Sequence, residues 1–396
     1  MGKIKYFTEK IGVRNKYVIL RLDLNVPIIN KKIQDYTRID LSLPLIKSLR
    51  NKRAKIIILS HLGRPKGKAD QKLSLKPIFD YLKKRLKSKI FFHTEEITRK
   101  TKQKITFLKG GEIMLFENVR FNKGETNDSN YFAKNLASLG DIYVNDAFSC
   151  SHRKQASIHK ITHFLTFKYG GPLLRKEVEA IDKIINSRRS PVTCIIGGSK
   201  ISTKINVLRN LISKVDNIFI VGAMANNFLK FNGIRVGKSL IEKNTKIIIE
   251  KIYTISKKNN CTIFIPIDYK TSNNLGGNAT SKGLESIKNN EMILDIGKQT
   301  IKKIDNIIEK SKTVLWNGPA GYFENDNFLE GTLSIAKKIS GSTIKNNLIS
   351  IVGGGDTLFA INKSRKKFRF THLSTAGGAF LEFLEGKDLP GLNVLK

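Results

Sequence analysis

The chain has 396 residues, enough for two domains, and 40% of them are hydrophobic and 26% charged, which is typical of globular rather than disordered proteins. It has no apolar run of about 18 residues, so a membrane-spanning helix is excluded, and its N-terminal stretch lacks the pattern of a secretory signal. The three cysteines, Cys150, Cys194 and Cys261, have no metal-ligand spacing and predict reduced thiols in the cytoplasm.

The net charge of +38 comes from 71 basic and 33 acidic residues. Such an excess is compatible with a basic nucleic-acid-binding protein. The lysines, however, are scattered beside Asn and Ile, as an A/T-rich genome would produce, and they form no basic tail or block. Because clustered rather than total charge makes an electrostatic footprint, we expect no nucleic-acid partner and keep that function as an alternative.

Nine short apolar runs recur along the chain, separated by lysine-rich stretches with helical spacing. The runs cover 17–25, 55–61, 112–120, 141–148, 192–198, 217–222, 261–268, 313–318 and 347–355. Their apolar character on both faces predicts buried parallel strands in βαβ units. A charged amphipathic pattern at 176–191, stopped by Ser190-Pro191, predicts a helix between the first four runs and the last five.

Polar and cationic residues follow the runs of the first half. They are Asp23, Asn25, Arg38, His61, Arg64, Arg120 and Arg153. Open parallel sheets bind ligands at the carboxyl ends of their strands, and arginine binds phosphate and carboxylate through its planar fork. The first half therefore predicts a site for a small molecule with several anionic groups.

Glycine and lysine follow the runs of the second half. The turns contain Gly197-Gly198 with Lys200 and Lys204, then GGGDT at 353–357, then Gly377-Gly378. Glycines let the backbone approach a phosphate, a helix start offers free N–H groups, and lysines four residues apart share one face of a helix. An acid beside such a turn usually holds Mg²⁺ by one carboxylate, which makes Asp356 a candidate ligand.

With these residues located, the chain resembles the phosphoglycerate kinase family from about residue 5 to its C-terminus. The resemblance rests on RLDLNVP (21–27), SHLGRP (60–65), ENVRFNKGE (117–125), VNDAF followed by HR (144–153), GGSKISTKI (197–205), LWNGPAGYFE (315–324), GGGDT (353–357) and LEFLEGKDLPG (381–391). On the residues alone, another α/β nucleotide-dependent phosphotransferase remains the alternative.

The resemblance implies an α/β fold of two Rossmann-like three-layer domains with parallel sheets, joined by a helix and separated by a cleft. It places a 3-phosphoglycerate domain at 1–175, a connecting helix at 176–190 and a nucleotide domain at 191–379, with residues 380–396 packing back on the first domain. The implied protein is a cytoplasmic, monomeric glycolytic kinase without a membrane or nucleic-acid partner. It transfers a phosphoryl group in line between 1,3-bisphosphoglycerate and Mg-ADP on domain closure, giving 3-phosphoglycerate and ATP.

The resemblance also implies roles for individual residues. The substrate would be held by Asp23, Leu24, Asn25, Arg38, His61, Leu62, Gly63, Arg64, Arg120 and Arg153. The nucleotide would be held by Lys204, Glu324 near the ribose, Gly354, Gly355, Asp356 and Thr357, with Mg²⁺ near Asp356 and bound largely through the nucleotide phosphates. Arg38, Lys200, Gly377 and Gly378 match the positions expected to act on the transferred phosphoryl group.

Three departures from the family pattern stand in these motifs. Ala376 replaces a glycine of the STGGGA turn, Val221 and Ala223 replace two glycines of GGGMA, and Ser149-Cys150 follows NDAF in place of the more usual Gly-Thr. We expect the first to tighten the catalytic turn and the second to narrow the adenine pocket. None removes a charged group, so we expect effects on rate and affinity rather than loss of activity.

Overall fold

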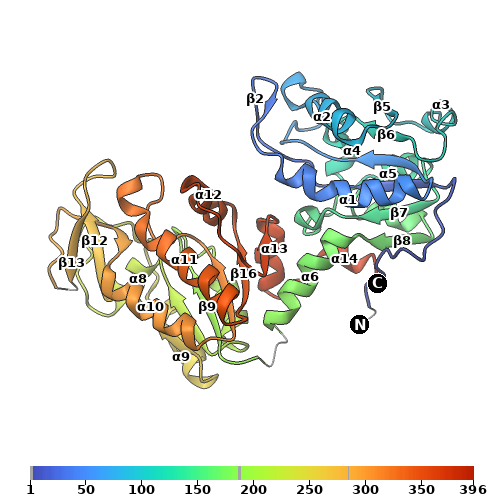
Figure 1. Cartoon of the computed structure of the whole chain (residues 1–396). Helices are drawn as coiled ribbons and strands as arrows, with labels where there is room; N and C mark the ends of the chain where they lie inside the picture. Colours follow the sequence, from blue (N-terminus) through green and yellow to red (C-terminus); the bar gives the residue numbers. More distant parts are fainter. Residues whose placement is uncertain (1–2, 186–188, 284) are drawn as a thin grey trace. The chain divides into compact units, whose positions relative to one another are not determined.

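The computed structural model describes residues 3–185, 189–283 and 285–396, which form two compact units (Figure 1). Unit 1 comprises Met1–Val178 and Asp388–Lys396, and unit 2 comprises Glu179–Lys387. Helix α6 (Pro172–Ile185) runs across the boundary between them. It begins before the predicted connecting helix, whose residues 186–188 lie outside the described residues.

Unit 1 contains a six-stranded parallel sheet. In spatial order its strands are β5 (Ile90–His93), β6 (Ile113–Phe116), β4 (Lys55–Leu59), β1 (Tyr17–Arg21), β7 (Ile142–Asn145) and β8 (Phe167–Gly170). The helices of this unit are α1 (Thr37–Asn51), α2 (Lys76–Leu86), α3 (Thr101–Lys104), α4 (Lys123–Thr126), α5 (Asn130–Ala137) and α14 (Pro390–Asn393). Its 3₁₀ turns are η1 (Gln71–Leu73), η2 (Val119–Phe121), η3 (Phe148–Cys150) and η4 (Lys160–Phe164), and a small hairpin joins β2 (Ile28–Ile29) to β3 (Lys32–Ile33).

The sheet of unit 1 is covered on both faces because its strands are apolar on both faces. Val18 and Leu20 pack in one cluster with the buried residues of α1 and α2. On the other face, Phe116 of β6 and Phe132 of α5 line the same pocket. Period-2 alternation in buried strands thus produces a three-layer arrangement.

Unit 1 also contains both ends of the described chain. The backbone N–H of Lys5 donates to Leu395 O at 2.9 Å, and that of Gly391 donates to Ser151 O at 2.8 Å. The C-terminal segment therefore packs beside the loop that follows β7.

Unit 2 contains the second six-stranded parallel sheet. In spatial order its strands are β11 (Thr262–Phe264), β10 (Asn217–Ile220), β9 (Val192–Ile196), β15 (Thr313–Asn317), β16 (Ile349–Gly353) and β17 (His372–Ser374). Its helices are α7 (Ile205–Ile212), α8 (Ala225–Phe231), α9 (Lys246–Lys258), α10 (Lys298–Lys310), α11 (Glu330–Lys345), α12 (Gly355–Lys363) and α13 (Gly378–Leu384), with the 3₁₀ turn η5 (Asp326–Phe328). One face of the sheet packs its core residues, among them Trp316, against α10, α11 and α12.

A three-stranded antiparallel sheet is added to unit 2. It has the order β13 (Thr280–Gly283), β12 (Asp268–Ser272), β14 (Met292–Ile296). The apolar runs did not predict it, because β12 (DYKTS) and β13 (TSKG) are mostly polar and the apolar run of β14 (MILDI) is short and interrupted by Asp295. Tyr269 of β12 packs with Leu229 of α8 in a separate small core, so this sheet is packed against a helix of unit 2.

The predicted α/β class with two parallel sheets is confirmed, and each of the nine predicted runs contains a strand. The runs missed β5, β8 and β17, which are edge strands of their sheets, short and only partly buried. No described helix has both the length and the apolar content needed to cross a bilayer.

Candidate active site

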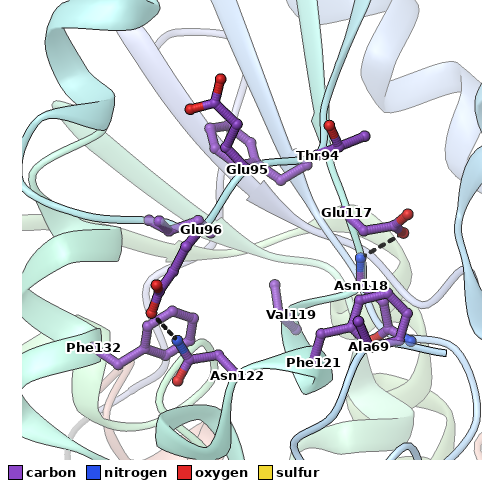
Figure 2. A pocket seen from close by; sticks show the side chains of 12 residues that line it. Ala69, Thr94, Glu95, Glu96, Glu117, Asn118, Val119, Phe121, Asn122 and Phe132 are labelled. Carbon is purple, nitrogen blue, oxygen red and sulfur yellow. Dashed lines mark hydrogen bonds between the residues drawn. The ribbon is translucent and has the colours of Figure 1, made fainter.

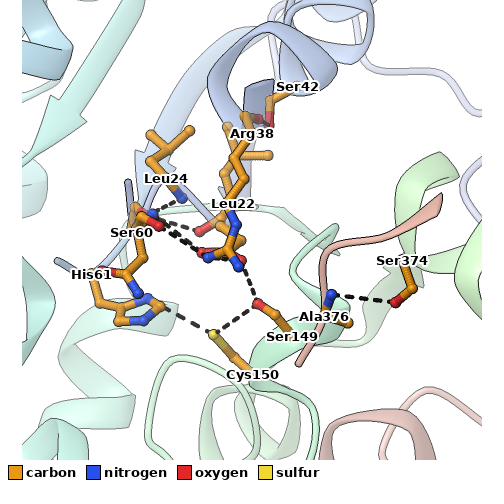
Figure 3. Close-up of polar contacts among 12 residues, drawn as sticks. Leu22, Leu24, Arg38, Ser42, Ser60, His61, Ser149, Cys150, Ser374 and Ala376 are labelled. Atoms are coloured by element: carbon orange, nitrogen blue, oxygen red, sulfur yellow. Dashed lines mark hydrogen bonds and ion pairs between the residues drawn. The ribbon is translucent and has the colours of Figure 1, made fainter. Parts of the chain in front are cut away.

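The residues predicted to form an anionic site in the first half lie near the carboxyl ends of β6, β4, β1 and β7, which are neighbours in the sheet of unit 1. Arg38, in the first turn of α1, is held by two acceptors on the loop after β1. Its Nη1 lies 2.9 Å from Asp23 Oδ2 and donates to Asn25 O at 2.9 Å. Figure 3 shows Arg38 beside the side chains of this loop and of the one after β4.

Backbone contacts connect Arg38 to a second group of arginines. Asn25 Oδ1 accepts from the N–H of Gly63 at 2.9 Å, and Gly63 O accepts from Arg120 Nη1 at 2.8 Å. Gly63 has φ = +60°, a conformation that favours glycine. The side chains of Leu24 and Leu62 lie in the core of unit 1, so these two can reach a ligand only through their backbone.

Arg64, Arg120 and Arg153 line a cavity of about 550 Å³ in unit 1. Lys66 and Lys123 line it as well, and no acidic side chain does. Arg120 is only 4% exposed; burial lowers its pKa to about 10, and its Nε has no hydrogen-bond partner in the described part of the chain. A buried cation with an unused donor favours an anionic ligand at this place.

His61 is buried beside this cavity's arginines without lining the cavity itself. Burial and then the charge of Arg21 lower its pKa well below the usual value, so the ring is neutral at pH 7. Its Nδ1 lies 3.2 Å from Arg21 Nη2, and a guanidinium can only donate. Nδ1 therefore accepts, the ring proton sits on Nε2, and this N–H is a donor that the ring can offer to a ligand.

Arg21 is a buried residue of the site that sequence reasoning missed. It is fully buried, and its Nε donates to Ser157 Oγ at 2.9 Å. Ser157 Oγ in turn donates to Glu125 Oε1 at 2.7 Å, so the serine connects the arginine to a buried carboxylate. The signal was available, because a charged residue ends the otherwise apolar β1.

A different pocket of unit 1, of about 270 Å³, belongs to none of the predicted sites (Figure 2). Glu95, Glu96 and Glu117 line it together with aromatic side chains. Glu117 is occupied structurally, since it accepts from Ser74 Oγ at 2.6 Å and from the N–H of Leu75 at 2.7 Å. The three carboxylates that line this pocket would repel an anionic ligand.

The predicted glycine turns of unit 2 follow β9, β16 and β17, and Asn317 lies at the end of β15 between the first two strands. Lys204 is 9% exposed, and its Nζ donates to Asn317 Oδ1, while Asn317 Nδ2 donates to Gly353 O at 2.9 Å. Burial lowers the pKa of Lys204 to about 8, and Asp356 opposes that shift. Asn317, missed as a site residue, thus ties the lysine to the loop before α12.

The predicted pairing of Lys200 with Lys204 on one helical face is wrong. Helix α7 begins at Ile205, and residues 199–204 form a bend and turn. Ser202 stabilises this loop by donating to the Glu242 carboxylate from its N–H at 3.0 Å and from its Oγ at 2.5 Å. Lys204 is consequently buried, whereas Lys200 is exposed.

The turn from Gly353 to Thr357 has the geometry of a phosphate loop. Gly354 has φ = +104°, and a Cβ there would lie 2.9 Å from Asn317 Nδ2. Gly355 and Asp356 open α12, and the buried Thr357 accepts the N–H of Gly318 on its Oγ1 at 2.8 Å. The first N–H groups of a helix have no partner within the helix, and those at the start of this nine-residue helix suit phosphate oxygens.

The turn at Gly377-Gly378 precedes α13. Gly377 has φ = +55°, a backbone conformation that favours glycine, and a Cβ there would meet no heavy atom within 4 Å. A side chain at this position would therefore be disfavoured by the backbone conformation and not by lack of space. Ala376 is buried, and its N–H donates to Ser374 Oγ at 3.3 Å. The methyl group that Ala376 adds in place of the family's glycine is therefore buried within unit 2.

A cavity of about 540 Å³ in unit 2 adjoins the turns at Gly198 and Asp356, a volume in the range of small-molecule sites. Most of its lining is apolar and comes from the antiparallel sheet and the loops around it, including Tyr269 and Met292. Glu324, Asp356 and Ala223 also line it. Val221 does not, because it is fully buried in the sheet core, so only Ala223 can narrow this cavity.

Asp356 is an exposed carboxylate that fits a nucleotide-bound Mg²⁺ better than a closed metal cage. The described residues contain no group of three His, Cys, Asp or Glu side chains arranged to hold a metal ion. Mg²⁺ commonly takes one or two carboxylates and completes its shell with water and substrate phosphates. One acid beside a phosphate loop meets that requirement.

Comparisons with known proteins agree along nearly the whole chain. The family model described as phosphoglycerate kinase matches residues 8–387. The chain is 45% identical over 390 residues to the phosphoglycerate kinase of Wolbachia sp. subsp. Drosophila simulans (strain wRi), covering 98% of each chain. It is 43% identical to that of Bradyrhizobium diazoefficiens, again covering 98% of each.

Solved structures are similar as well. The phosphoglycerate kinase of Coxiella burnetii superposes with a TM-score of 0.88 at 38% identity, covering 98% of this chain and 97% of that one. The enzyme of Pyrococcus horikoshii OT3 superposes with a TM-score of 0.83 at 29% identity, covering 98% of each chain.

Proposed function

The chain belongs to the phosphoglycerate kinase family, and we propose how its two units divide that family's reaction. It is a glycolytic phosphotransferase that interconverts 1,3-bisphosphoglycerate and ADP with 3-phosphoglycerate and ATP. The basic nucleic-acid-binding alternative is not favoured. The cavity of unit 1 lined by three arginines and no acid is the observation that carries the assignment of the acid substrate.

In unit 1, Arg64, Arg120 and Arg153 would bind the stable phosphate of 3-phosphoglycerate, since their cavity offers only positive charge. Arg38, with the loop from Asp23 to Asn25, would face the carboxyl end of the molecule. His61 would offer the substrate a neutral N–H donor from its Nε2. The hydrogen bonds of Gly63 to Asn25 and to Arg120 place the two groups of residues next to each other, which supports their binding opposite ends of one small molecule.

In unit 2, the apolar cavity would take the nucleobase of ADP or ATP, and Glu324 the ribose hydroxyls. Lys204 and the Gly354–Thr357 turn would bind the phosphates. Mg²⁺ near Asp356 would supply positive charge along the phosphate chain when the nucleotide is bound.

The chemistry requires little of the protein beyond position and charge. The attacking carboxylate is already ionised at pH 7, so no general base is needed, and a neutral His61 is consistent with that. Arg38, Lys200 and the N–H groups at Gly377-Gly378 would then stabilise the charge of the phosphoryl group during in-line transfer. The two binding sets belong to different units, and we propose that closure of the two domains aligns the bound substrates and excludes water during transfer.

The purified chain tests the assignment directly. In a coupled assay, ATP consumption should depend on 3-phosphoglycerate and on Mg²⁺. Separately, we expect the enzyme to be a monomer and to be located in the cytoplasm. Lack of turnover together with tight, salt-sensitive binding of RNA or DNA would instead support the nucleic-acid alternative.

A further inference from the structure

The turn η3, which follows β7, carries the Ser149-Cys150 pair that departs from the family pattern. Ser149 Oγ donates to Asp23 Oδ2 at 2.5 Å, the same oxygen that lies 2.9 Å from Arg38 Nη1. Figure 3 shows Ser149 between Arg38 and Cys150, with Cys150 directed toward His61. A glycine at 149 would provide no such donor.

The Asp23 carboxylate is held on both oxygens. Oδ1 accepts the N–H of Asn25 at 3.2 Å, and Oδ2 receives both Ser149 and Arg38. Arg38 Nη1 in turn contacts Asp23 Oδ2 and Asn25 O. The direction of the guanidinium therefore depends on a carboxylate that Ser149 helps to fix.

Cys150 does not provide this function. Its Sγ lies 3.6 Å from Ser149 Oγ and 3.8 Å from His61 Nδ1. Burial raises the pKa of the thiol, so it stays protonated and is at most a weak donor.

We propose that Ser149 is a positioning residue for phosphoryl transfer, acting through Asp23 to hold Arg38 in the orientation that meets the substrate. The Ser149 hydroxyl donates a hydrogen bond to Asp23 Oδ2, and this bond restricts rotation of the carboxylate. The inference rests on the proposed function, in which Arg38 acts on the transferred phosphoryl group. A guanidinium misplaced by a fraction of an ångström stabilises the transition state less while leaving nucleotide binding intact.

The first test is Ser149→Ala in steady-state assays with both substrates. We expect kcat to fall about tenfold, the lower end of what a hydrogen bond to a charged group is worth, and KM for ADP to stay unchanged. Ser149→Thr keeps the hydroxyl and should restore kcat to within about twofold. Ser151→Ala is the matched control: this serine is fully buried two residues along, its Oγ has no hydrogen-bond partner among the described residues, and its removal should leave kcat unchanged.

A double-mutant cycle with Asp23→Asn tests the route. If Ser149 acts through the Asp23 carboxylate, Ser149→Ala should add no further loss of kcat to Asp23→Asn. Independent, multiplying losses would overturn the inference, as would full kcat in Ser149→Ala.

Arg38→Ala separates the two levels of the argument. Loss of turnover there with normal turnover in Ser149→Ala would refute only the role of Ser149. Normal turnover in Arg38→Ala would refute the proposed role of Arg38 itself.

Discussion

Lys204 illustrates how burial prepares a single side chain for an anionic ligand. Its ammonium group is almost enclosed, bonded to Asn317, and has a pKa lowered to about 8 by burial. Bound phosphates would favour the charged form, so nucleotide binding and protonation of this lysine should be coupled.

We therefore expect affinity for Mg-ADP to decrease as the pH rises through 8, by about tenfold between pH 7 and pH 9. Below pH 7 the lysine is charged in the free protein, and this contribution should level off. Calorimetric titration across this range measures it. Lys204→Ala should bind Mg-ADP more weakly and lose the pH dependence; unchanged affinity in that variant would transfer the role to Lys200.

Substitution of Arg38 should affect the chemical step without affecting nucleotide binding, the opposite of what we expect for Lys204. Arg38→Ala should lower kcat by about 10² to 10³, the usual loss for one well-placed donor to a developing charge. Because Arg38 belongs to unit 1, Mg-ADP affinity in unit 2 should remain normal. Parallel measurement of kcat and of the dissociation constant for Mg-ADP checks both statements, and a fall in nucleotide affinity would contradict the division of roles.

Among the structural elements, the ends of strands were predictable and the starts of helices were not. Runs such as KIIIL are buried whatever surrounds them, so the sequence located β4 and the side chains that follow it. The loop at Lys200 depends instead on Ser202 and Glu242, forty residues apart, and no local pattern contains that contact. Likewise Arg21 lies inside the predicted apolar run 17–25, and only the fold brings Ser157 and Glu125 to it.

The loop before α12 provides a prediction at this scale. Gly354→Ala forces a side chain into φ = +104° and places its Cβ 2.9 Å from Asn317 Nδ2. We expect a loss of about 1 to 3 kcal/mol in the free energy of unfolding. Gly355→Ala is the control, because its Cβ would meet no heavy atom within 4 Å and its φ lies outside the left-handed region. Urea denaturation measures both, and equal losses would contradict the role of the backbone conformation.

For the whole molecule, buried acids set part of the pH dependence of stability. Asp146 is 3% exposed, and its Oδ1 accepts the N–H groups of Leu173 and Leu174 at the start of α6, at 2.7 and 3.0 Å. Burial raises its pKa to about 6, well above the value of an unfolded chain. The folded state therefore binds the proton more strongly, and this group's contribution to stability is complete below about pH 4 and is lost as the pH rises through 6.

Asp146→Asn should remove that contribution while keeping an oxygen for the two N–H groups. We expect the wild-type protein to gain about 1.4 kcal/mol from this group between pH 7 and pH 5, and the variant to lack the gain. Urea denaturation at both pH values gives the difference. An identical pH dependence in the variant would show that Asp146 does not titrate in this range.

The return of residues Asp388–Lys396 to unit 1 has a consequence for synthesis on the ribosome. Unit 2 is one continuous stretch of chain, whereas the contacts from Lys5 to Leu395 and from Ser151 to Gly391 need the last residues to be made. The half of the protein translated first is therefore the half completed last. During translation, the loop carrying Ser149 lacks its contact with Gly391 until residues 388–396 have been made.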